Sequence, residues 1–547
     1  MSQTGAGGRT RAIIEAMSSL PSNPPPMVEI ELKFQLPEPA RRAVETAVAA
    51  GESRRVRLQA IYHDTPDRRL AAAGIALRVR KEGRRWVQTL KAGGPDAMQR
   101  LEHNVPLVGA MGVPAGAVPG ADVQRHAGTA AGERLAATLA AGDGDAAAPR
   151  LVALYHTDIW RRARSLRAAG GTVEIAFDSG VIMAGERRLP VCELEIELLR
   201  GRPGAVIDVA RRWVRRHRLW LDVRSKAERG DRLARGVPTG AVARAEPVRL
   251  APGMSADDAL RAVVANGLRQ ILPNASELAG GTGTDEHLHQ LRVGLRRLRT
   301  ALRFFDGWTV PIDPAWAERL GALFRQLGRV RDRDALAESL LPALRKAGAP
   351  LFELPPAPEG PTPGELLRGT DATLMWLDLL AWQVDRPVAP IAPLPVVEAP
   401  AEDTGSLPFV AASSAPALPA AAAERLQRWH HRVVRAAKGY AELDDEARHR
   451  LRKRVKRLRY AAEFVAALYK GKAVARYLKL LAPLQDSLGR YNDLCVGLET
   501  YRSAVGDDPR AWFAIGWLTA RRDVLLAESA AALKAFARCE PFWKERK

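Results

Sequence analysis

The first half of the chain alternates apolar and polar residues, which is the pattern of β-strands that bury one face. The alternation is clearest in "MVEIELKFQL" (residues 27–36), where Glu29, Glu31 and Lys33 interleave with four apolar side chains. The segments "IALRVRKEGRRWVQTLK", "GTVEIAFDSG" and "LPVCELEIELLRG" continue it, with Gly-containing turns between them. We expect a strand-rich domain at 27–235, preceded by a disordered leader at 1–26.

Helical periodicity replaces this pattern in the second half, which indicates a second domain of a different class at 255–545, after a linker at 236–254. Within it, "HQLRVGLRRLRTALRFF" from His289 recurs as "HRLRKRVKRLRYAAEFV" from His449, and "LGRVRD" from Leu327 recurs as "LGRYND" from Leu488. Two segments that recur in the same order at nearly constant spacing indicate a tandem duplication. We expect two pseudo-symmetric repeats at 255–385 and 421–545, joined by a Pro- and Ala-rich linker at 386–420.

Net charge narrows the choice of partner. The chain has 83 Lys and Arg against 62 Asp and Glu, a formal charge of +21, which favours nucleic acid, an anionic membrane surface or phosphate chains without choosing among them. Its three cysteines are too few and too scattered for a disulfide framework or a zinc site, so we expect a cytoplasmic protein. No apolar run reaches the roughly 18 residues that a membrane span needs.

The repeated helix carries a basic stripe. Steps of three and four residues place one set of cations and histidines on the same helix face in each repeat: His289, Arg292, Arg296, Arg299 and Arg303, then His449, Arg452, Lys456 and Arg459. A solvated surface is the simpler interpretation, but such surfaces usually have acidic residues at i±4, which are nearly absent here. The stripe therefore favours an anion-binding groove, with the histidines as phosphate partners rather than zinc ligands.

Both copies resemble the CHAD family of conserved-histidine α-helical domains, through the H-x-L-R-x(3)-[RK]-R-L-R helix and the later L-G-x-x-x-D turn. The resemblance implies an all-α domain of two four-helix bundles around a basic cavity that binds inorganic polyphosphate.

Charged residues also alternate along the other strands. Arg78 and Arg80, Lys91, Arg100 and Glu102, and the series Glu193, Glu195 and Glu197 each occupy one face. These charges could decorate a surface, but if helices cover the apolar faces the strands enclose a charged lumen. The second arrangement suits phosphate chemistry: carboxylates hold a divalent cation, and Arg and Lys pair with the phosphate oxygens. Phosphoryl transfer needs mainly positioning and charge stabilisation, so no Ser or Cys nucleophile is required.

These strands resemble the CYTH family of triphosphate tunnel enzymes. The E-x-E-x-K signature at Glu29, Glu31 and Lys33 is followed in the family's order by "LRVRKEG", "QTLK", "QRLE", "TDIWRR", "FDSG", "CELEIEL" and "SKAERG". The resemblance implies a closed antiparallel β-barrel of about eight strands with covering helices. It also implies a triphosphate bound inside the barrel and hydrolysed with Mg²⁺ or Mn²⁺.

The resemblance further implies a role for each matching residue. Metal ligands are expected at Glu29, Glu31, Glu193, Glu195 and Asp178. Catalysis is expected from Glu29, Glu31 and Lys33. Phosphate binding is expected from Lys33, Arg78, Arg80, Lys91, Arg100, Arg161 and Lys226, with Arg161 rather than its neighbour Arg162 facing inward.

The two halves favour one ligand type, so the sequence predicts an inorganic triphosphatase that converts tripolyphosphate to diphosphate and phosphate. Its helical domain would bind long-chain polyphosphate and associate the enzyme with polyphosphate granules. The alternatives are a CYTH-type adenylate cyclase, a thiamine triphosphatase, or a polyphosphate-binding protein without catalysis. Nucleic acid is disfavoured because the stripes lack interleaved aromatic residues. Oligomeric state stays open.

Overall fold

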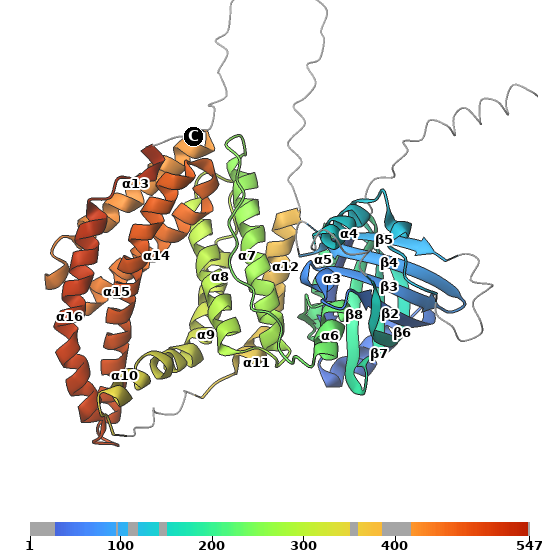
Figure 1. Ribbon diagram of the computed structural model, residues 1–547, viewed down its shortest axis with the longest axis horizontal. Coiled ribbons are helices and arrows are strands. Elements are labelled where there is room, and N and C mark those ends of the chain that lie inside the picture. The colour runs from blue at the N-terminus through green and yellow to red at the C-terminus, as the bar shows by residue number, and fades with distance from the viewer. Residues whose placement is uncertain are drawn as a thin grey trace, which may run out of the picture. The chain divides into compact units, whose positions relative to one another are not determined.

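The computed structural model describes residues 28–94, 97–107, 119–141, 150–350, 359–384 and 417–544, with the backbone alone at 329–339. The chain divides into two compact units, Met1–Pro238 and Thr239–Lys547 (Figure 1). The expected leader at 1–26 and nearly all of the expected linker at 386–420 lie outside the described residues.

The first unit is built around a closed antiparallel barrel. Its strands are β1 (Val28–Gln35), β2 (Arg54–Asp64), β3 (Ile75–Glu82), β4 (Arg85–Gly93), β5 (Gln99–Pro106), β6 (Val152–Ala168), β7 (Gly171–Ala184) and β8 (Arg187–Gly201), with a short β9 (Trp220–Leu221) beside β1. They are ordered β5-β4-β3-β2-β6-β7-β8-β1-β9, and pairing of β5 with β1 closes the ring. The prediction of an eight-stranded antiparallel barrel is thus confirmed.

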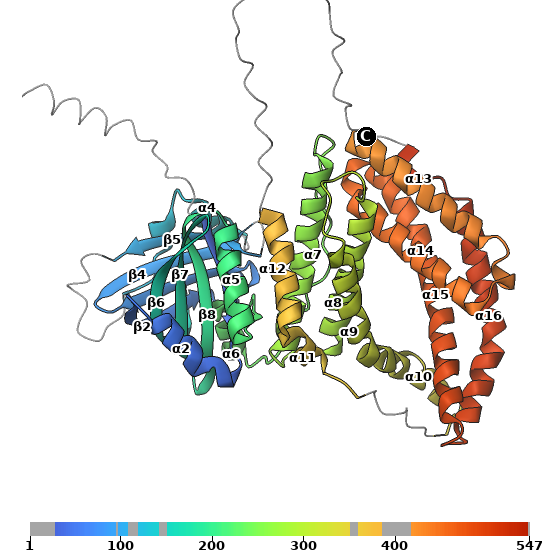
Figure 2. The same ribbon diagram turned by 180° about the vertical axis from the view of Figure 1, so that it is seen from behind.

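Helices cover the apolar outside of this barrel, as Figure 2 shows for α2 (Arg41–Ala49) and α5 (Gly204–His217). Helix α5 packs on β8, β1 and β7, where Leu194 and Ile196 are completely buried. Because successive side chains of a strand face opposite sides, the glutamates that flank these residues face the barrel interior. Short helices α3 (Arg69–Ala72) and α4 (Ala130–Ala140) and the 3₁₀ turns Glu38–Ala40 and Val123–His126 complete the unit.

Helix α6 (Lys226–Arg235) closes one part of the lumen. Its Ala227, Leu233 and Ala234 pack against an inward-facing apolar cluster that includes Tyr62 and Tyr155, whose rings stack at 4.7 Å. Gly230 is required at this contact, because a Cβ there would lie 2.2 Å from the Tyr155 ring. The side chain of Ser225 caps the helix by accepting a hydrogen bond from the Glu228 N–H. Cap, packing and glycine together set the direction in which Lys226 and Arg229 point.

The second unit begins with an irregular segment at 239–255 and is otherwise built from helices and their connecting loops in its described residues. The helices are α7 (Ala256–Ala279), α8 (Asp285–Phe304), α9 (Ala315–Ser339), α10 (Leu341–Lys346), α11 (Pro363–Arg368), α12 (Thr370–Val384), α13 (Leu418–Ala437), α14 (Asp445–Phe464), α15 (Gly471–Ala504) and α16 (Ala511–Ala537). Single 3₁₀ turns lie at Tyr440–Glu442, Ala466–Leu468 and Phe542–Lys544. This confirms the all-α prediction.

The two repeats meet where α8 packs against α14, the two helices that carry the basic stripes. Their apolar stripes are buried, including Leu291, Leu295, Val455 and Leu458. An ion pair between Arg297 on α8 and Glu463 on α14, at 2.5 Å, also joins the two repeats. The predicted first repeat contains α7 to α12, and the predicted second repeat contains α14 to α16 and most of α13.

Candidate functional site

The row predicted from the first strand points into the lumen. Strand β1 pairs with β8 so that Glu31 lies opposite Glu197, and Lys33 opposite Glu195. Paired residues of antiparallel strands share a face, so the charges of the two strands lie side by side. Glu29 lies opposite Arg100 on the other neighbour, β5. The lumen thus brings together carboxylates and cations from strands that are distant in the sequence.

Carboxylates crowd together where β1, β4, β5 and β8 meet. Lys91 contacts Glu29 at 2.6 Å and Glu102 at 3.3 Å, while Arg100 lies 3.8 Å from Glu31. Burial, supplemented by Glu31 and Glu102, raises the pKa of Glu29 to about 8 despite Lys91. Burial, with Glu31 next to it, likewise raises the pKa of Glu197 to about 7. The raised pKa values of these two carboxyl groups show that burial favours their neutral form more than the nearby cations favour the ionised form.

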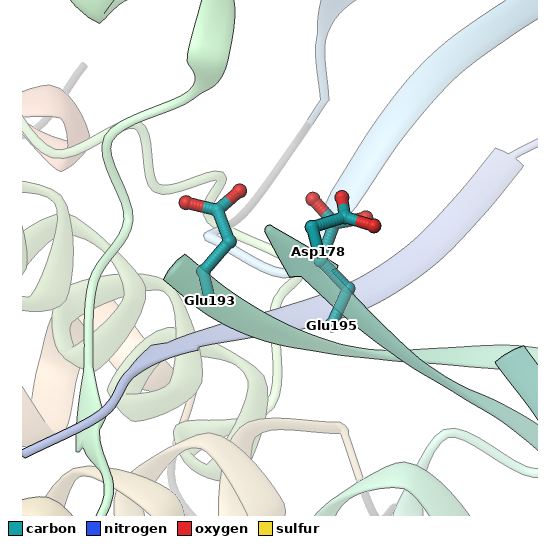
Figure 3. Close-up of side chains that lie close together, drawn as sticks. All are labelled: Asp178, Glu193 and Glu195. Carbon is teal, nitrogen blue, oxygen red and sulfur yellow. The ribbon is translucent and has the colours of Figure 1, made fainter. Parts of the chain in front are cut away.

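A second acidic cluster is formed by Asp178 on β7 and by Glu193 and Glu195 on β8. Register places Asp178 opposite Glu193, and Figure 3 shows the three carboxyl groups on the same side of the two strands. One oxygen from each lies within 4.8 Å of the others, which is the geometry of a possible metal site. Asp178 and Glu193 have no solvent exposure at all.

Three cations compensate this cluster. Lys226 Nζ contacts Asp178 at 2.7 Å, Glu195 at 2.8 Å, and Glu193 as well. Arg161 donates two hydrogen bonds of 2.7 Å to Asp178 and also contacts Glu195. Arg229, one helical turn beyond Lys226, contacts Glu193. Although burial opposes it, Arg161 and Lys226 lower the pKa of Asp178, and Lys226 and Arg161 hold that of Glu195 well below its usual value.

The remaining predicted phosphate ligands also face the lumen. Arg78 donates a 3.1 Å hydrogen bond to the Tyr62 hydroxyl, and Arg80 contacts Glu82. Lys33 donates to the Arg224 carbonyl at 3.1 Å, and burial lowers the pKa of its ammonium. The structure therefore places the predicted strand residues on the inner face of the barrel, Arg161 among them, while Lys226 reaches the same lumen from helix α6.

The helical unit contains a cavity of about 1200 Å³ between the two repeats. Seven of the eight residues predicted to bind polyphosphate line it: His289, Arg292, Arg296, Arg299, His449, Arg452 and Lys456. The eighth, Arg459, is not among the lining residues, because its guanidinium contacts Glu463 at 2.9 Å. In its place the second repeat contributes Lys453 and Arg457.

Like charges dominate this cavity. Its lining holds eleven Lys and Arg but four Asp and Glu among the described residues. One of the four, Asp445, is held by Arg448 and Arg522 at 2.9 and 3.0 Å. Burial and then the neighbouring Arg452 and Arg296 lower the pKa of Lys456 to about 7. The cavity lining thus has an excess of positive charge, which an anionic ligand could compensate.

The histidines have distinct roles. His449 lines the cavity and contacts the Asn492 side-chain oxygen at 2.6 Å. His287 caps α8 instead, since its Nδ1 accepts a hydrogen bond from the Thr284 N–H. His430 is buried beside the Tyr477 hydroxyl at 3.0 Å. Among the described residues, none of these three histidines belongs to a group of three or more side chains that could hold a metal ion.

Comparison with protein families separates the chain in the same way as the structure. Residues 27–230 match the CYTH domain, and residues 262–502 match the CHAD domain. The chain consists of a CYTH domain followed by a CHAD domain. The two resemblances drawn from the motifs are therefore confirmed, as is the pairing of a barrel with a helical domain.

A curated relative is named inorganic triphosphatase, from Haemophilus influenzae, and is 28% identical over 172 residues, which are 31% of this chain and 44% of that protein. The chain thus spans less than half the length of this relative. Among solved structures, the CHAD domain of the plant Ricinus communis is 28% identical, with 54% of this chain and 97% of that chain covered and a TM-score of 0.40. A Hippeastrum protein described with a dominant triphosphatase activity is 19% identical, covering 38% and 96% at a TM-score of 0.28. None of the described helices is long and apolar enough to cross a bilayer.

The ion pairs of the CYTH lumen lead to a prediction about stability. Replacement of Arg229 by Met removes one of the two cations that contact completely buried Glu193, the other being Lys226. We expect a loss of about 3–5 kcal/mol in the free energy of unfolding, since an uncompensated buried charge is costly. Urea unfolding followed by tryptophan fluorescence measures it. Arg57→Met is the control, because Arg57 pairs with Asp158 on the exposed surface and should matter little. Similar losses in both variants would contradict the prediction.

Proposed function

We propose that the CYTH domain is a metal-dependent inorganic triphosphatase that hydrolyses tripolyphosphate to diphosphate and phosphate. The observation that carries the proposal is the mixture of charges on one inner face, where carboxylates of β1 and β8 lie next to Lys and Arg of the other strands. A metal–phosphate complex carries both signs of charge, so it can exchange partners with ion pairs that the lumen already forms. The name of the Haemophilus influenzae relative supports this substrate.

The donor set fits a hard divalent cation. Every candidate ligand is a carboxylate, and the oxygens of Asp178, Glu193 and Glu195 converge within 4.8 Å. Burial, and to a lesser extent the neighbouring Glu31 and Glu102, raises the pKa of Glu29 to about 8, so a cation that contacts Glu29 and Glu31 would stabilise the ionised carboxylates there as well. When bound, Mg²⁺ or Mn²⁺ neutralises phosphoryl oxygens and orients the attacking water.

The basic residues of the lumen would hold and orient the substrate. Lys33 is anchored on the Arg224 carbonyl, and Arg78 on Tyr62, so both are positioned before a phosphate enters. Arginines can bind phosphate oxygens through two parallel hydrogen bonds, which fixes the direction of the chain. Burial keeps water away from the ion pairs and strengthens their electrostatic effect on the developing charge.

The acidic residues of β1 provide the first test. Glu29→Gln and Glu31→Gln keep the shape of each side chain but remove its charge, so each should lower tripolyphosphate hydrolysis at saturating Mg²⁺ or Mn²⁺ by about 100-fold or more. Phosphate release measures the rate, with ATP and thiamine triphosphate as competing substrates that separate the alternative activities.

Glu133→Gln on α4, an exposed first-turn glutamate outside the barrel lumen, is the matched control and should keep full activity. Unchanged turnover in both β1 variants would refute the assignment. Faster turnover of ATP or thiamine triphosphate than of tripolyphosphate would instead indicate one of the alternative activities.

For the CHAD domain we propose the binding of long-chain polyphosphate in the cavity between the repeats. The supporting observation is the excess of cations over acids in its lining, from helices α8 and α14 together. Arg292 and Arg296 lie 4.9 and 5.6 Å from the Phe324 ring centroid, so this aromatic ring supports guanidinium groups. Cytoplasmic location and association with polyphosphate granules stay predictions of the sequence.

Four cations of the cavity test this proposal. Combined replacement of Arg292, Arg296, Arg452 and Lys456 by Ala should weaken polyphosphate binding to the full-length protein by at least about 100-fold and flatten its salt dependence, because each lost charge removes a phosphate partner. The matched control replaces four exposed cations of α13 and the residue after it: Arg428, Arg432, Arg435 and Lys438. Equal affinity in the two quadruple variants would contradict the proposal.

Binding should also depend on pH through Lys456, whose pKa is about 7 in the free protein. A bound polyphosphate would raise this pKa, so that above pH 7 binding takes up a proton and affinity falls as the pH rises. Titrations between about pH 7 and about pH 9 measure the slope, a range above the titration of a histidine. Lys456→Arg keeps its charge throughout and should reduce the decline. The same slope in both proteins would exclude Lys456 as its source.

A further inference from the structure

Lys226 occupies the centre of the second acidic cluster. Its ammonium contacts all three carboxylates, at 2.7 Å from Asp178, 2.8 Å from Glu195 and in direct contact with Glu193. These are the same three groups whose oxygens converge within 4.8 Å of one another. A Mg²⁺ ion bound by these oxygens would lie about 2.0–2.1 Å from each of them. The ammonium therefore lies in the space that a cation bound by all three carboxylates would need.

The two cations cannot share this space. A divalent ion in contact with the three oxygens would lie well inside the contact distance of Nζ, and both carry positive charge in a site with no exposure at Asp178 or Glu193. Arg161 contacts Asp178 and Glu195, and Arg229 contacts Glu193, whereas Lys226 alone contacts all three carboxylates. The lysine is therefore the cation that a shared metal ion would displace.

The side chain of Lys226 can also change its position without a movement of helix α6. It is the first residue of α6, next to the Ser225 cap, so its flexible stem starts at the helix end rather than in its packed middle. The packing that fixes α6 involves Ala227, Gly230 and Leu233, none of which depends on where the ammonium lies. A new rotamer of one side chain can thus open the cluster while the helix stays in place.

We infer that Lys226 is an internal counter-ion that fills the Asp178–Glu193–Glu195 cluster in the empty enzyme, and that a divalent cation binds there only by displacing it. The displaced ammonium needs a new anion, and phosphate oxygens in the lumen supply one. Metal and substrate binding are therefore coupled through Lys226. This inference rests on the proposed function only in taking a divalent cation and a phosphate chain as the ligands.

The first experiment measures Mn²⁺ binding to full-length, substrate-free protein by the electron paramagnetic resonance signal of free Mn²⁺. In Lys226→Met, which keeps the stem without the charge, Mn²⁺ should bind at the cluster about tenfold or more tightly than in the native protein. Adding Glu195→Gln to this variant should abolish the gain. Arg80→Met is the matched control, because it removes a lumen cation that contacts Glu82 rather than the cluster, and it should give a much smaller gain.

The second experiment uses the native protein and does not depend on whether a variant folds. Reductive methylation followed by peptide mass spectrometry reports the reactivity of the Lys226 amine, which should rise when Mn²⁺ is added because the ion pairs are broken. Unchanged Lys226 reactivity, or equal Mn²⁺ affinity in Lys226→Met and the native protein, would overturn the inference. Tripolyphosphate hydrolysis by the native protein is measured in parallel, so that this failure is distinguished from failure of the proposed function.

Discussion

Every charged group in the barrel lumen has to be compensated, because burying an isolated charge costs several kcal/mol. A closed barrel makes this condition strict, since its inner face is shielded from solvent and its strands leave no free edge. The lumen meets it by placing opposite charges on adjacent strands, so that Lys91 pairs with Glu29 and Arg161 with Asp178. Helix α6 completes the arrangement, because Lys226 and Arg229 reach the glutamates of β8 from one helical face.

The same condition bears on the proposed function. Under that proposal, a phosphate chain would take over the cations of the existing ion pairs and a metal ion would take over the carboxylates, so neither needs the barrel to refold. The two acidic groups differ in their protonation equilibria: burial raises the pKa of Glu29 to about 8, whereas Arg161 and Lys226 lower the pKa of Asp178 although burial opposes them.

Sequence patterns predicted the parts of this protein that depend on local periodicity. Alternation along β1 placed Glu29 and Lys33 on one face, the chemistry of phosphate binding and the CYTH resemblance assigned that face to the lumen, and the repeated helix located most of the cavity lining. Partners that depend on distant contacts could not be read in this way. Lys226 was predicted to bind phosphate, but its contacts with three carboxylates follow from the angle at which α6 meets the barrel. Arg459 was predicted to line the cavity, yet Glu463 one turn later holds it.

Arg297 and Arg457 show the same limit in the duplicated helix. They occupy corresponding positions in the two repeats, but Arg297 pairs with Glu463 across the α8–α14 contact while Arg457 lines the cavity. One acidic residue, present in the second repeat alone, breaks the symmetry that the sequence repeat implies. Its effect is to concentrate uncompensated cations on the cavity side. The CHAD cavity thus departs from the rule that governs the CYTH lumen, because it leaves like charges together. Under the proposed functions, an anionic ligand would relieve their repulsion in the cavity, whereas a ligand of the barrel would exchange one set of ion pairs for another.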